Sequence, residues 1–454
     1  MTFIAVTYLA RVLGVEMFGF VGFAAAVATL FLLVVDAGLD LVAMREIARN
    51  RAALEGVLSS VVRLRLGLSV VAAAVMCALA PWLTSSAPGR AIILAYSLTL
   101  VSSAVNLKWA FQALEQNGLV AVALVLGQAV YLAGLLSWVR GPADAFDVPL
   151  LLALAELSAG ALLFARCRWT GARAWVRPPH GLRWRMLREA FPLAGVRIAR
   201  TVALNFDLLL LGLVGSASAV GIYAAASRII FLLRELSEAY HLPLFPRLTR
   251  MAGQGSEGFV AVGREGLRYA AIIIFPAAVG GCLTAPQLLS VLFGPEYAPA
   301  SHALCLLLMA LVVSMLTGVC RFGLIAYHRQ RALFFITASG TLVNVALNVI
   351  LIPRYSVVGA AWSALASEGL IFGLSWRAMA QSAPLSPWGP VFRPALAAGG
   401  LAAILGLLSG APFPVTCVVA GISYVVLLFV VGALRPREVI AATRAAVTPS
   451  QLRP

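Results

Sequence analysis

The chain has 454 residues, of which 61% are hydrophobic and only 11% are charged, and its mean hydropathy is +0.95. A soluble protein carries about 25% charged residues, so this composition excludes a soluble globular enzyme or binding module and indicates a polytopic membrane protein. We interpret the net charge of +16 as a sign of basic cytoplasmic loops rather than of nucleic-acid binding, because the cytoplasmic loops of membrane proteins are enriched in arginine and lysine.

Apolar segments follow one another along the chain, separated by short polar stretches. Their approximate ranges are 1–13, 18–38, 59–83, 91–107, 119–139, 148–165, 190–214, 219–244, 267–285, 300–326, 332–352, 358–376, 393–409 and 414–434. Since about 20 helical residues cross a hydrocarbon core of about 30 Å, we expect an all-α protein with about 14 transmembrane helices. The first segment is short, so it is either a stub packed against its neighbours or the end of a longer helix.

The basic residues alternate from loop to loop. When the N-terminus is placed in the cytoplasm, the large majority of the 34 lysines and arginines fall on the inner side. The outer loops then hold only Arg11, Arg90, Arg140 and Arg354. This asymmetry follows the positive-inside rule and predicts that both termini are cytoplasmic.

A basic loop over residues 166–189 separates six predicted helices from eight. The two halves are weakly similar: Phe18-Gly19-Phe20 matches Val220-Gly221-Ile222, and the arginine-containing motif 45–49 matches 247–250. Because six is an even number, the halves share one orientation, which is the parallel repeat of many secondary transporters. We therefore expect a six-helix lobe at 1–170, a cytoplasmic linker at 171–189, a second six-helix lobe at 190–380, two additional helices at 390–436 and a cytoplasmic tail at 437–454, with a central cavity between the lobes.

Ionisable residues lie inside two successive predicted helices. One face of the helix over 190–214 carries Arg197, Arg200 and Asp207. A stripe on the helix over 219–244 carries Arg234, Glu238 and His241, with Arg228 and Glu235 beside it. Each charge at mid-membrane costs roughly 2.5–3.5 kcal/mol on insertion scales, so these stripes predict the wall of a water-filled cavity.

Two interpretations of these charges remain open. In the first, ion pairs such as Arg234 with Glu238 and Arg200 with Asp207 hold the helix bundle together. In the second, the arginines bind an anionic headgroup, because the planar guanidinium group binds phosphate oxygens bidentately. We favour the second interpretation because intramembrane charge is rare and usually faces a transport pathway.

Glu156 and Glu368 lie in the middle of predicted helices, where each could carry a proton or act as a protonated structural donor. Asn344 and Asn348 share one helix face and are expected to bond neighbouring helices. Asp36 and Asp40 are close in sequence to two arginines, and we expect them to pair with Arg45 or Arg49. Arg321 is expected near an inner helix end, where its side chain can reach the interface.

The chain contains 4 histidines and 6 cysteines. They show neither metal-ligand spacing nor a CxxC pair, so we expect no metal site, no cofactor and no disulfide framework.

The order and spacing of several motifs resemble polysaccharide-export flippases of the Wzx type. The resemblance covers most of residues 8–370, and the motifs that carry it are Ala10-Arg11-Val12-Leu13-Gly14, Asp36-Ala37-Gly38-Leu39, Lys108-Trp109-Ala110-Phe111-Gln112-Ala113-Leu114-Glu115, Phe206-Asp207, Phe245-Pro246-Arg247-Leu248, Leu292-Phe293-Gly294-Pro295-Glu296-Tyr297 and Pro353-Arg354-Tyr355. These flippases are similar to the lipid II flippases and, more distantly, to the multidrug and toxin extrusion transporters.

The resemblance implies two six-helix lobes around a central cavity and transport by alternating access in the bacterial cytoplasmic (inner) membrane. The implied cargo is an oligosaccharide on undecaprenyl diphosphate, such as an O-antigen or exopolysaccharide unit, which moves from the cytoplasmic to the outer leaflet. The last two helices exceed the twelve-helix core, as in the lipid II flippases, where extra helices form a lipid-tail groove. This chain departs from the pattern in its short first helix and in a first lobe with few buried charges.

We therefore predict a transporter rather than an enzyme. The residues predicted to contact the diphosphate are Arg197, Arg200, Arg228 and Arg234. The residues predicted to orient them or to couple ions are Asp207, Glu235, Glu238, His241, Glu156 and Glu368. The expected partners are the lipid-linked oligosaccharide, membrane lipids and a polysaccharide polymerase, with no nucleic acid, and the expected state is a monomer.

Other functions are compatible with part of this pattern. A multidrug or lipid II exporter of the same fold is one alternative, although cationic drugs favour an acidic cavity. A membrane-embedded polymerase or glycosyltransferase is less favoured because every predicted outer loop is short. A non-transporting scaffold is a further alternative, which only a transport assay excludes.

Overall fold

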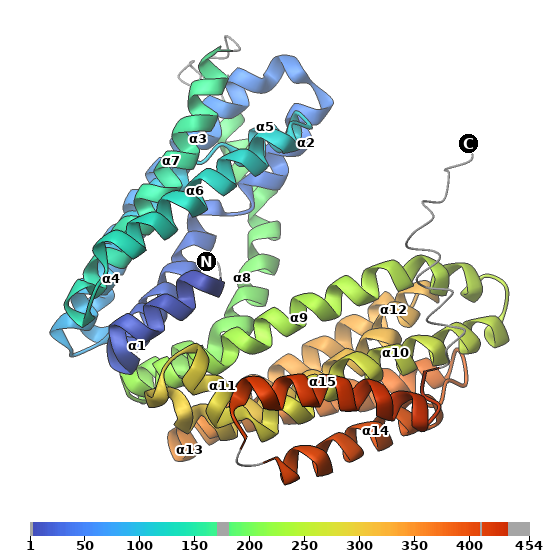
Figure 1. Cartoon of the computed structure of the whole chain (residues 1–454). Helices are drawn as coiled ribbons and strands as arrows, with labels where there is room; N and C mark the ends of the chain where they lie inside the picture. Colours follow the sequence, from blue (N-terminus) through green and yellow to red (C-terminus); the bar gives the residue numbers. More distant parts are fainter. Residues whose placement is uncertain (1–2, 170–180, 409–410, 435–454) are drawn as a thin grey trace. The chain divides into compact units, whose positions relative to one another are not determined.

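A computed structural model describes residues 3–169, 181–408 and 411–434, and over these ranges the chain is helical and contains no strand (Figure 1). The side chains of residues 168–169, 192–200 and 203–204 lie outside the described part. Within the described residues, 11 helical segments are long and apolar enough to cross a membrane. The prediction of an all-α polytopic membrane protein is therefore confirmed.

The fourteen predicted segments agree with this architecture once two backbone breaks are considered. Helix α1 (Phe3–Asp36) contains the first two segments, separated by non-helical backbone at Gly14, and α13 (Gln330–Ala380) contains two more, separated at Ser356. The predicted segment 190–214 lies in α8 (Leu182–Val214).

Most of the other helices follow the predicted segments, but three short ones, over residues 39–49, 108–113 and 285–292, form in stretches that were expected to connect these segments. Together, these other helices are α2 (Leu39–Arg49), α3 (Leu54–Leu83), α4 (Ala87–Ala104), α5 (Lys108–Ala113), α6 (Asn117–Trp138), α7 (Asp147–Trp169), α9 (Ala217–Ala252), α10 (Ser256–Leu283), α11 (Ala285–Leu292), α12 (Ser301–Ala326), α14 (Trp388–Leu407) and α15 (Phe413–Val430). Short 3₁₀ helices occur at Arg51–Ala53, Pro142–Phe146 and Pro295–Ala300.

The chain divides into two compact units, Met1–Ala224 and Ala225–Pro454, and the division falls inside α9. This point is later than the linker expected at 171–189, because α8 packs against α1, α2 and α3 of the first unit. Residues 182–189, which we expected in the linker, are already helical.

In the first unit, the turn between α1 and α2 places two acidic residues close together. Gly38 has φ 74°, a left-handed conformation that costs glycine little because it has no Cβ atom. The chain therefore changes direction directly after α1, and Asp36 and Asp40 lie on the two sides of this turn.

Two glycines allow α1 to cross the first turns of α9 at very short range. A Cβ atom added to Gly19 would lie 1.8 Å from the carbonyl oxygen of Ala217, and one added to Gly221 would lie 2.2 Å from that of Val15. Small residues at helix crossings are typical of membrane proteins, because there the association of helices depends on close packing.

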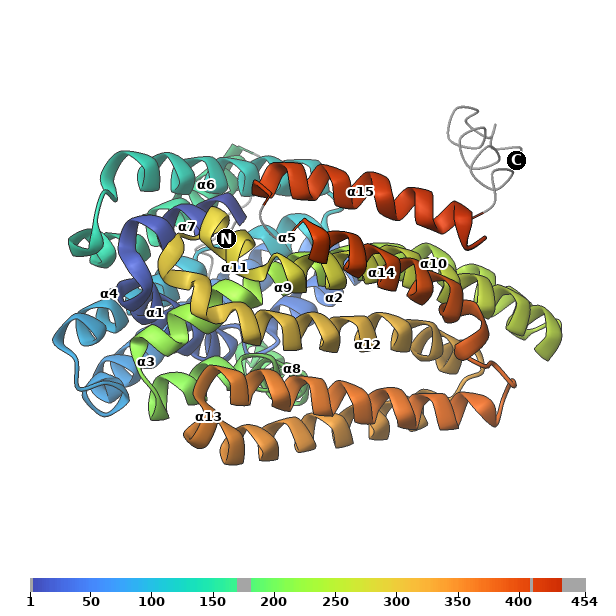
Figure 2. The same ribbon diagram turned by 60° about the horizontal axis from the view of Figure 1, so that its bottom comes forward.

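In the second unit, the two arms of α13 form an antiparallel hairpin (Figure 2). Asn344 donates a hydrogen bond to Ser367 Oγ over 3.3 Å, and Asn348 donates to Asn344 Oδ1 over 3.0 Å. The first of these bonds confirms the expected role of Asn344 in joining neighbouring helices. Gly340 lies against Ile371, so the arms face each other along their length.

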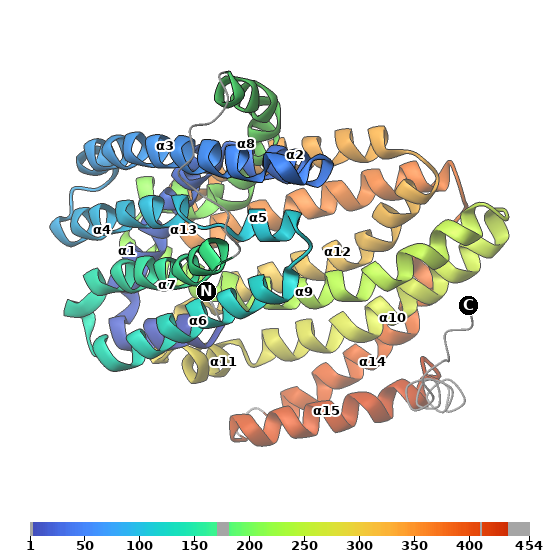
Figure 3. The same ribbon diagram turned by 90° about the horizontal axis from the view of Figure 1, so that it is seen from above.

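The additional helices α14 and α15 lie side by side and pack against α10 (Figures 2 and 3). The Tyr424 hydroxyl donates to the carbonyl oxygen of Ile272 over 3.2 Å. A small buried apolar cluster, which includes Leu401, Leu405 and Leu428, fills the space between these helices. Both helices are thus integrated into the second unit.

Candidate intramembrane charge site

Arg197 and Arg200 lie on the α8 backbone, but their side chains are outside the described residues. Asp207, further along α8, is half-buried and accepts a hydrogen bond from the Tyr223 hydroxyl over 2.6 Å. This bond links α8 to the first turns of α9 and fixes the position of the carboxylate. The predicted pairing of Arg200 with Asp207 stays a prediction.

Four charged residues from α9, α12 and α13 form a network in the second unit. Arg234 Nη2 lies 3.5 Å from Glu368 Oε1, and Arg321 Nη2 lies 2.7 Å from Glu238 Oε1. The Arg321 guanidinium is also close enough to the Glu368 carboxylate to attract it electrostatically. We call these four residues, Arg234, Glu238, Arg321 and Glu368, the charge network.

The expected pairing of Arg234 with Glu238 on one helix is wrong, because each of these residues pairs with another helix. Arg321 lies near the end of α12 (Ser301–Ala326), as expected, but its pairing with Glu238 was not predicted. No periodicity within α9 could reveal these pairs, because the partners are contributed by α12 and α13. The network therefore joins three helices rather than stabilising one.

The charge network is electrically balanced and partly open. The side chains of Arg234 and Glu368 are 44% and 20% exposed, and those of Arg321 and Glu238 are 39% and 50% exposed. Each guanidinium group is thus held by one carboxylate and still has unfilled donor positions, since a guanidinium group has five N–H donors. An anionic ligand at this site would either accept hydrogen bonds from the remaining N–H donors of the arginines or displace one of the two carboxylates.

The other predicted residues of α9 have different environments. Arg228 is half-buried and Glu235 is exposed. His241 is 1% exposed, and its Nδ1 atom lies 2.7 Å from the carbonyl oxygen of Ser237. Its ring packs against Phe322 and fills the space left by Gly318, so His241 belongs to the α9–α12 interface.

Glu156 is half-buried in α7 and accepts a hydrogen bond from Ser102 Oγ over 2.6 Å. Asp36 and Lys108 lie close enough to act on its carboxylate electrostatically. Glu156 is therefore near a second group of charges, in the first unit, which the sequence did not reveal.

Arg65 is the centre of this second group. Its side chain is 2% exposed and pairs with Asp36 and with Asp40, whose Oδ1 atom is 2.6 Å from Arg65 Nη2. The prediction that Asp36 and Asp40 pair with Arg45 or Arg49 is wrong, because both pair with Arg65. Among the side chains that the structure describes, Arg65 is the one fully buried charge of the first unit, in agreement with the expectation of few buried charges in the first lobe. One sequence feature could have indicated this group of charges: Arg65 lies inside the predicted apolar segment 59–83.

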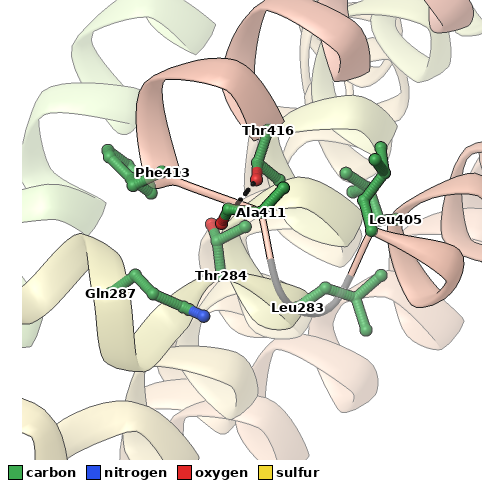
Figure 4. Close-up of a pocket in the computed structure, with 8 residues that line it drawn as sticks. Leu283, Thr284, Gln287, Leu405, Ala411, Phe413 and Thr416 are labelled. Atoms are coloured by element: carbon green, nitrogen blue, oxygen red, sulfur yellow. Dashed lines mark hydrogen bonds between the residues drawn. The ribbon is translucent and has the colours of Figure 1, made fainter.

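Two pockets outside the charge network are also present in the described residues. A cavity of about 30 Å³ lies among α10, α11, α14 and α15, lined by Thr284, Gln287, Phe413 and Thr416 (Figure 4). Thr416 Oγ1 donates to the carbonyl oxygen of Pro412 over 3.2 Å. This cavity has the size of a single water molecule. The other pocket, of about 430 Å³, is apolar and lies beside Met17, Ile92 and Phe146.

Comparison with known sequences agrees with this architecture. The sequence profile of the family described as "Polysaccharide biosynthesis protein" matches residues 1–252, and the profile "Lipid II flippase MurJ" matches residues 214–434. Among curated proteins, the "Putative O-antigen transporter" of Shigella dysenteriae is 24% identical over 374 residues, which cover 81% of this chain and 93% of that protein.

Two curated relatives from the archaeon Haloferax volcanii match a smaller part. The "Probable flippase AglR" is 31% identical over 44% of this chain and 43% of its own length. The "Probable low-salt glycan biosynthesis flippase Agl15" is 24% identical over 34% of this chain and 33% of its own length. The chain thus spans less than half of each of these two relatives.

Two solved structures have the same fold. "Lipid II flippase MurJ, inward closed conformation" gives a TM-score of 0.71 at 12% identity and covers 96% of both chains. A multidrug resistance MATE family transporter of the MOP superfamily gives a TM-score of 0.65 at 15% identity, covering 84% of this chain and 94% of that one. With the first profile spanning more than half of its length, this chain belongs to the polysaccharide biosynthesis protein family.

Proposed function

We propose that this protein is a flippase that moves a lipid-linked oligosaccharide from the cytoplasmic to the outer leaflet of a bacterial inner membrane. The proposed lipid carrier is undecaprenyl diphosphate, and the proposed cycle is alternating access without chemical conversion of the cargo. Membership of the polysaccharide biosynthesis protein family supports this proposal, as do the names of relatives that are flippases or an O-antigen transporter. We further propose a monomer with cytoplasmic termini and a polysaccharide polymerase as its partner.

The charge network of α9, α12 and α13 is the observation that carries the proposal. A diphosphate headgroup loses very favourable hydration when it enters hydrocarbon, and transfer without compensating bonds is strongly unfavourable. Arg234 and Arg321 are partly exposed and supply oriented guanidinium donors for phosphate oxygens. Because their present partners are carboxylates, the site is already arranged for an oxyanion.

In this proposal, Glu238 and Glu368 hold the arginines in position while the site is empty. A bound diphosphate replaces them, and the released carboxylate then takes up a cation or a proton. This exchange would link cargo binding to an ion gradient. Of the two carboxylates, Glu368 is the better candidate for taking up the cation or proton, because its side chain is only 20% exposed whereas that of Glu238 is 50% exposed. Arg197, Arg200 and Arg228 are the further proposed phosphate contacts, with Asp207 held by Tyr223.

The test is complementation of a deletion strain that lacks surface polysaccharide. Arg200→Ala, Arg234→Ala and Arg321→Ala should each lower surface polysaccharide on the order of tenfold or more, because a hydrogen bond to a charged group is worth about 1.5–3 kcal/mol. Lipid-linked intermediates should accumulate at unchanged protein levels. The matched control is Arg247→Ala, which removes an exposed ion pair with Glu265 and should complement fully. Full complementation by all three test variants would contradict the proposal.

Lipid II is the second candidate cargo, because the MurJ profile matches residues 214–434 and therefore includes α14 and α15. The two cargoes share a polyprenyl diphosphate and differ in the sugar. Expression in cells depleted of their own lipid II flippase distinguishes them: restored growth identifies lipid II as a cargo. Continued lysis together with restored surface polysaccharide in the deletion strain supports the oligosaccharide instead.

A further inference from the structure

Two cysteines oppose each other at one end of the second unit. Cys282 is the second-last residue of α10 (Ser256–Leu283), and Cys305 lies near the start of α12 (Ser301–Ala326). Helices α10 and α12 pack against each other, and both cysteines are half-buried. The close packing of Gly281 against Leu308 keeps the two backbones near one another at this level.

The contacts between the two cysteines are reciprocal. Cys305 Sγ donates to the carbonyl oxygen of Cys282 over 3.5 Å, and Cys282 Sγ donates to the carbonyl oxygen of Cys305 over 3.8 Å. Each sulfur atom therefore lies against the backbone of the other cysteine, so the two side chains extend toward each other rather than apart, and a disulfide can form only between cysteines that do so.

The location of this pair is compatible with oxidation. The segment that joins α10 to α12 contains α11 and the 3₁₀ helix Pro295–Ala300. The alternation of basic loops places this segment on the outer side of the membrane. Disulfides form and persist in such oxidising compartments, whereas cytoplasmic thiols stay reduced.

We propose that Cys282 and Cys305 form a disulfide in the mature protein. One thiolate attacks a sulfur atom of an oxidising protein disulfide, releasing one thiol of that oxidant and forming a mixed disulfide. The second cysteine thiolate then attacks its partner's sulfur atom and releases the oxidant as a dithiol. Two thiols are thereby oxidised, and the oxidant's disulfide accepts two electrons and two protons. The proposal rests on the proposed orientation, not on the transported cargo.

The disulfide would close a covalent loop around α11 and fasten the outer ends of α10 and α12. A cross-link of this kind stabilises a protein mainly by restricting its unfolded chain. Reduction should therefore lower the melting temperature of the purified protein while the fold remains intact below it.

The experiment is differential alkylation of the full chain purified from membranes. The protein is denatured under acid quench, its thiols are blocked, and the remaining disulfides are reduced and labelled with a second reagent. Peptide mass spectrometry should find the second label on Cys282 and Cys305 only. Cys282→Ser and Cys305→Ser should each abolish that labelling on the other cysteine and remove the effect of reductant on the melting temperature. Cys417→Ser is the matched control, because Cys417 is an exposed cysteine of α15, and it should leave the cross-link unchanged.

One result would overturn the proposal. If both cysteines carry the first label, and incubation of membranes with oxidised glutathione leaves them alkylatable, no disulfide forms at this site. Transport by the Cys282→Ser and Cys305→Ser variants is measured in parallel. Because thiol labelling does not depend on cargo, failure of the disulfide and failure of the flippase function are separate results.

Discussion

Arg65 is the most deeply buried charge among the described residues, and its two partners make it sensitive to substitution. Its guanidinium group pairs with Asp36 and Asp40, and its side chain is 2% exposed. Removing one member of a buried ion pair leaves an uncompensated charge and costs about 3–5 kcal/mol. We therefore expect Arg65→Ala to lower the melting temperature strongly in detergent, as measured by fluorescence-detected thermal unfolding.

Two further variants test whether the stability lost in Arg65→Ala arises from the unpaired charges of Asp36 and Asp40. Arg45→Ala removes a guanidinium group from an exposed pair with Glu189, with side chains 48% and 39% exposed, and should cost no more than about 1 kcal/mol. Combining Arg65→Met with Asp36→Asn and Asp40→Asn removes all three charges and should recover much of the stability. An Arg65→Ala protein that melts like the parent would contradict this account.

These residues also show which parts of the site the sequence could predict. Intramembrane charge on α9 was visible in the sequence, because a charged residue inside an apolar run is unusual. The partners were not visible. Asp36 is nearer in sequence to Arg45 than to Arg65, but the turn at Gly38 directs α2 away, and Arg45 contacts Glu189 instead. Pairing between helices depends on tertiary packing, which helical periodicity does not encode.

Among the structural elements, the crossing of α1 with α9 gives the sharpest packing prediction. A Cβ atom at Gly19 would meet the Ala217 carbonyl oxygen at 1.8 Å, whereas one at Gly22 would find its nearest neighbour at 3.8 Å. Gly19→Ala must therefore move a helix backbone and should destabilise the protein by about 1–3 kcal/mol. Gly22→Ala should be neutral or stabilising by up to about 1 kcal/mol, since alanine favours helix. Equal melting temperatures for the two variants would contradict the close crossing.

The hairpin of α13 depends on a strained turn. Ser356 has φ 48° and ψ −127°, a conformation that costs a residue with a Cβ atom about 1–3 kcal/mol. Ser356→Gly should therefore raise the melting temperature, with a net gain of about 1 kcal/mol after the entropy cost of glycine. Ser339→Gly, at an exposed regular position of the same helix, should lower stability by about 0.5 kcal/mol. If Ser356→Gly also lowers stability, the turn is not strained.

At the scale of the whole molecule, the number of helices could be predicted because lipid imposes a minimum apolar length on each span. The division between the compact units could not, since α8 packs on the first unit although a basic loop precedes it. Loop charge reports on the side of the membrane, and contacts between helices decide which unit a helix joins. The apolar pattern likewise predicted two segments within α13, over 332–352 and 358–376. It did not show that the backbone leaves the helical conformation at Ser356.

The orientation of the whole chain is the last prediction, and several others depend on it. Most basic loops fall on one side, and cation-rich loops remain in the cytoplasm because they are translocated poorly. Alkaline phosphatase fused after Gly141, in the loop before the 3₁₀ helix Pro142–Phe146, should be active, because this enzyme requires an oxidising outer compartment. Alkaline phosphatase fused after Gly255, between α9 and α10, should be inactive, whereas green fluorescent protein fused there should fluoresce. The reverse pattern of activity would place Cys282 and Cys305 in a reducing compartment and the charge-rich ends of α2 and α8 outside the cell. Both the proposed disulfide and the proposed direction of transport, from the inner to the outer leaflet, therefore depend on this result.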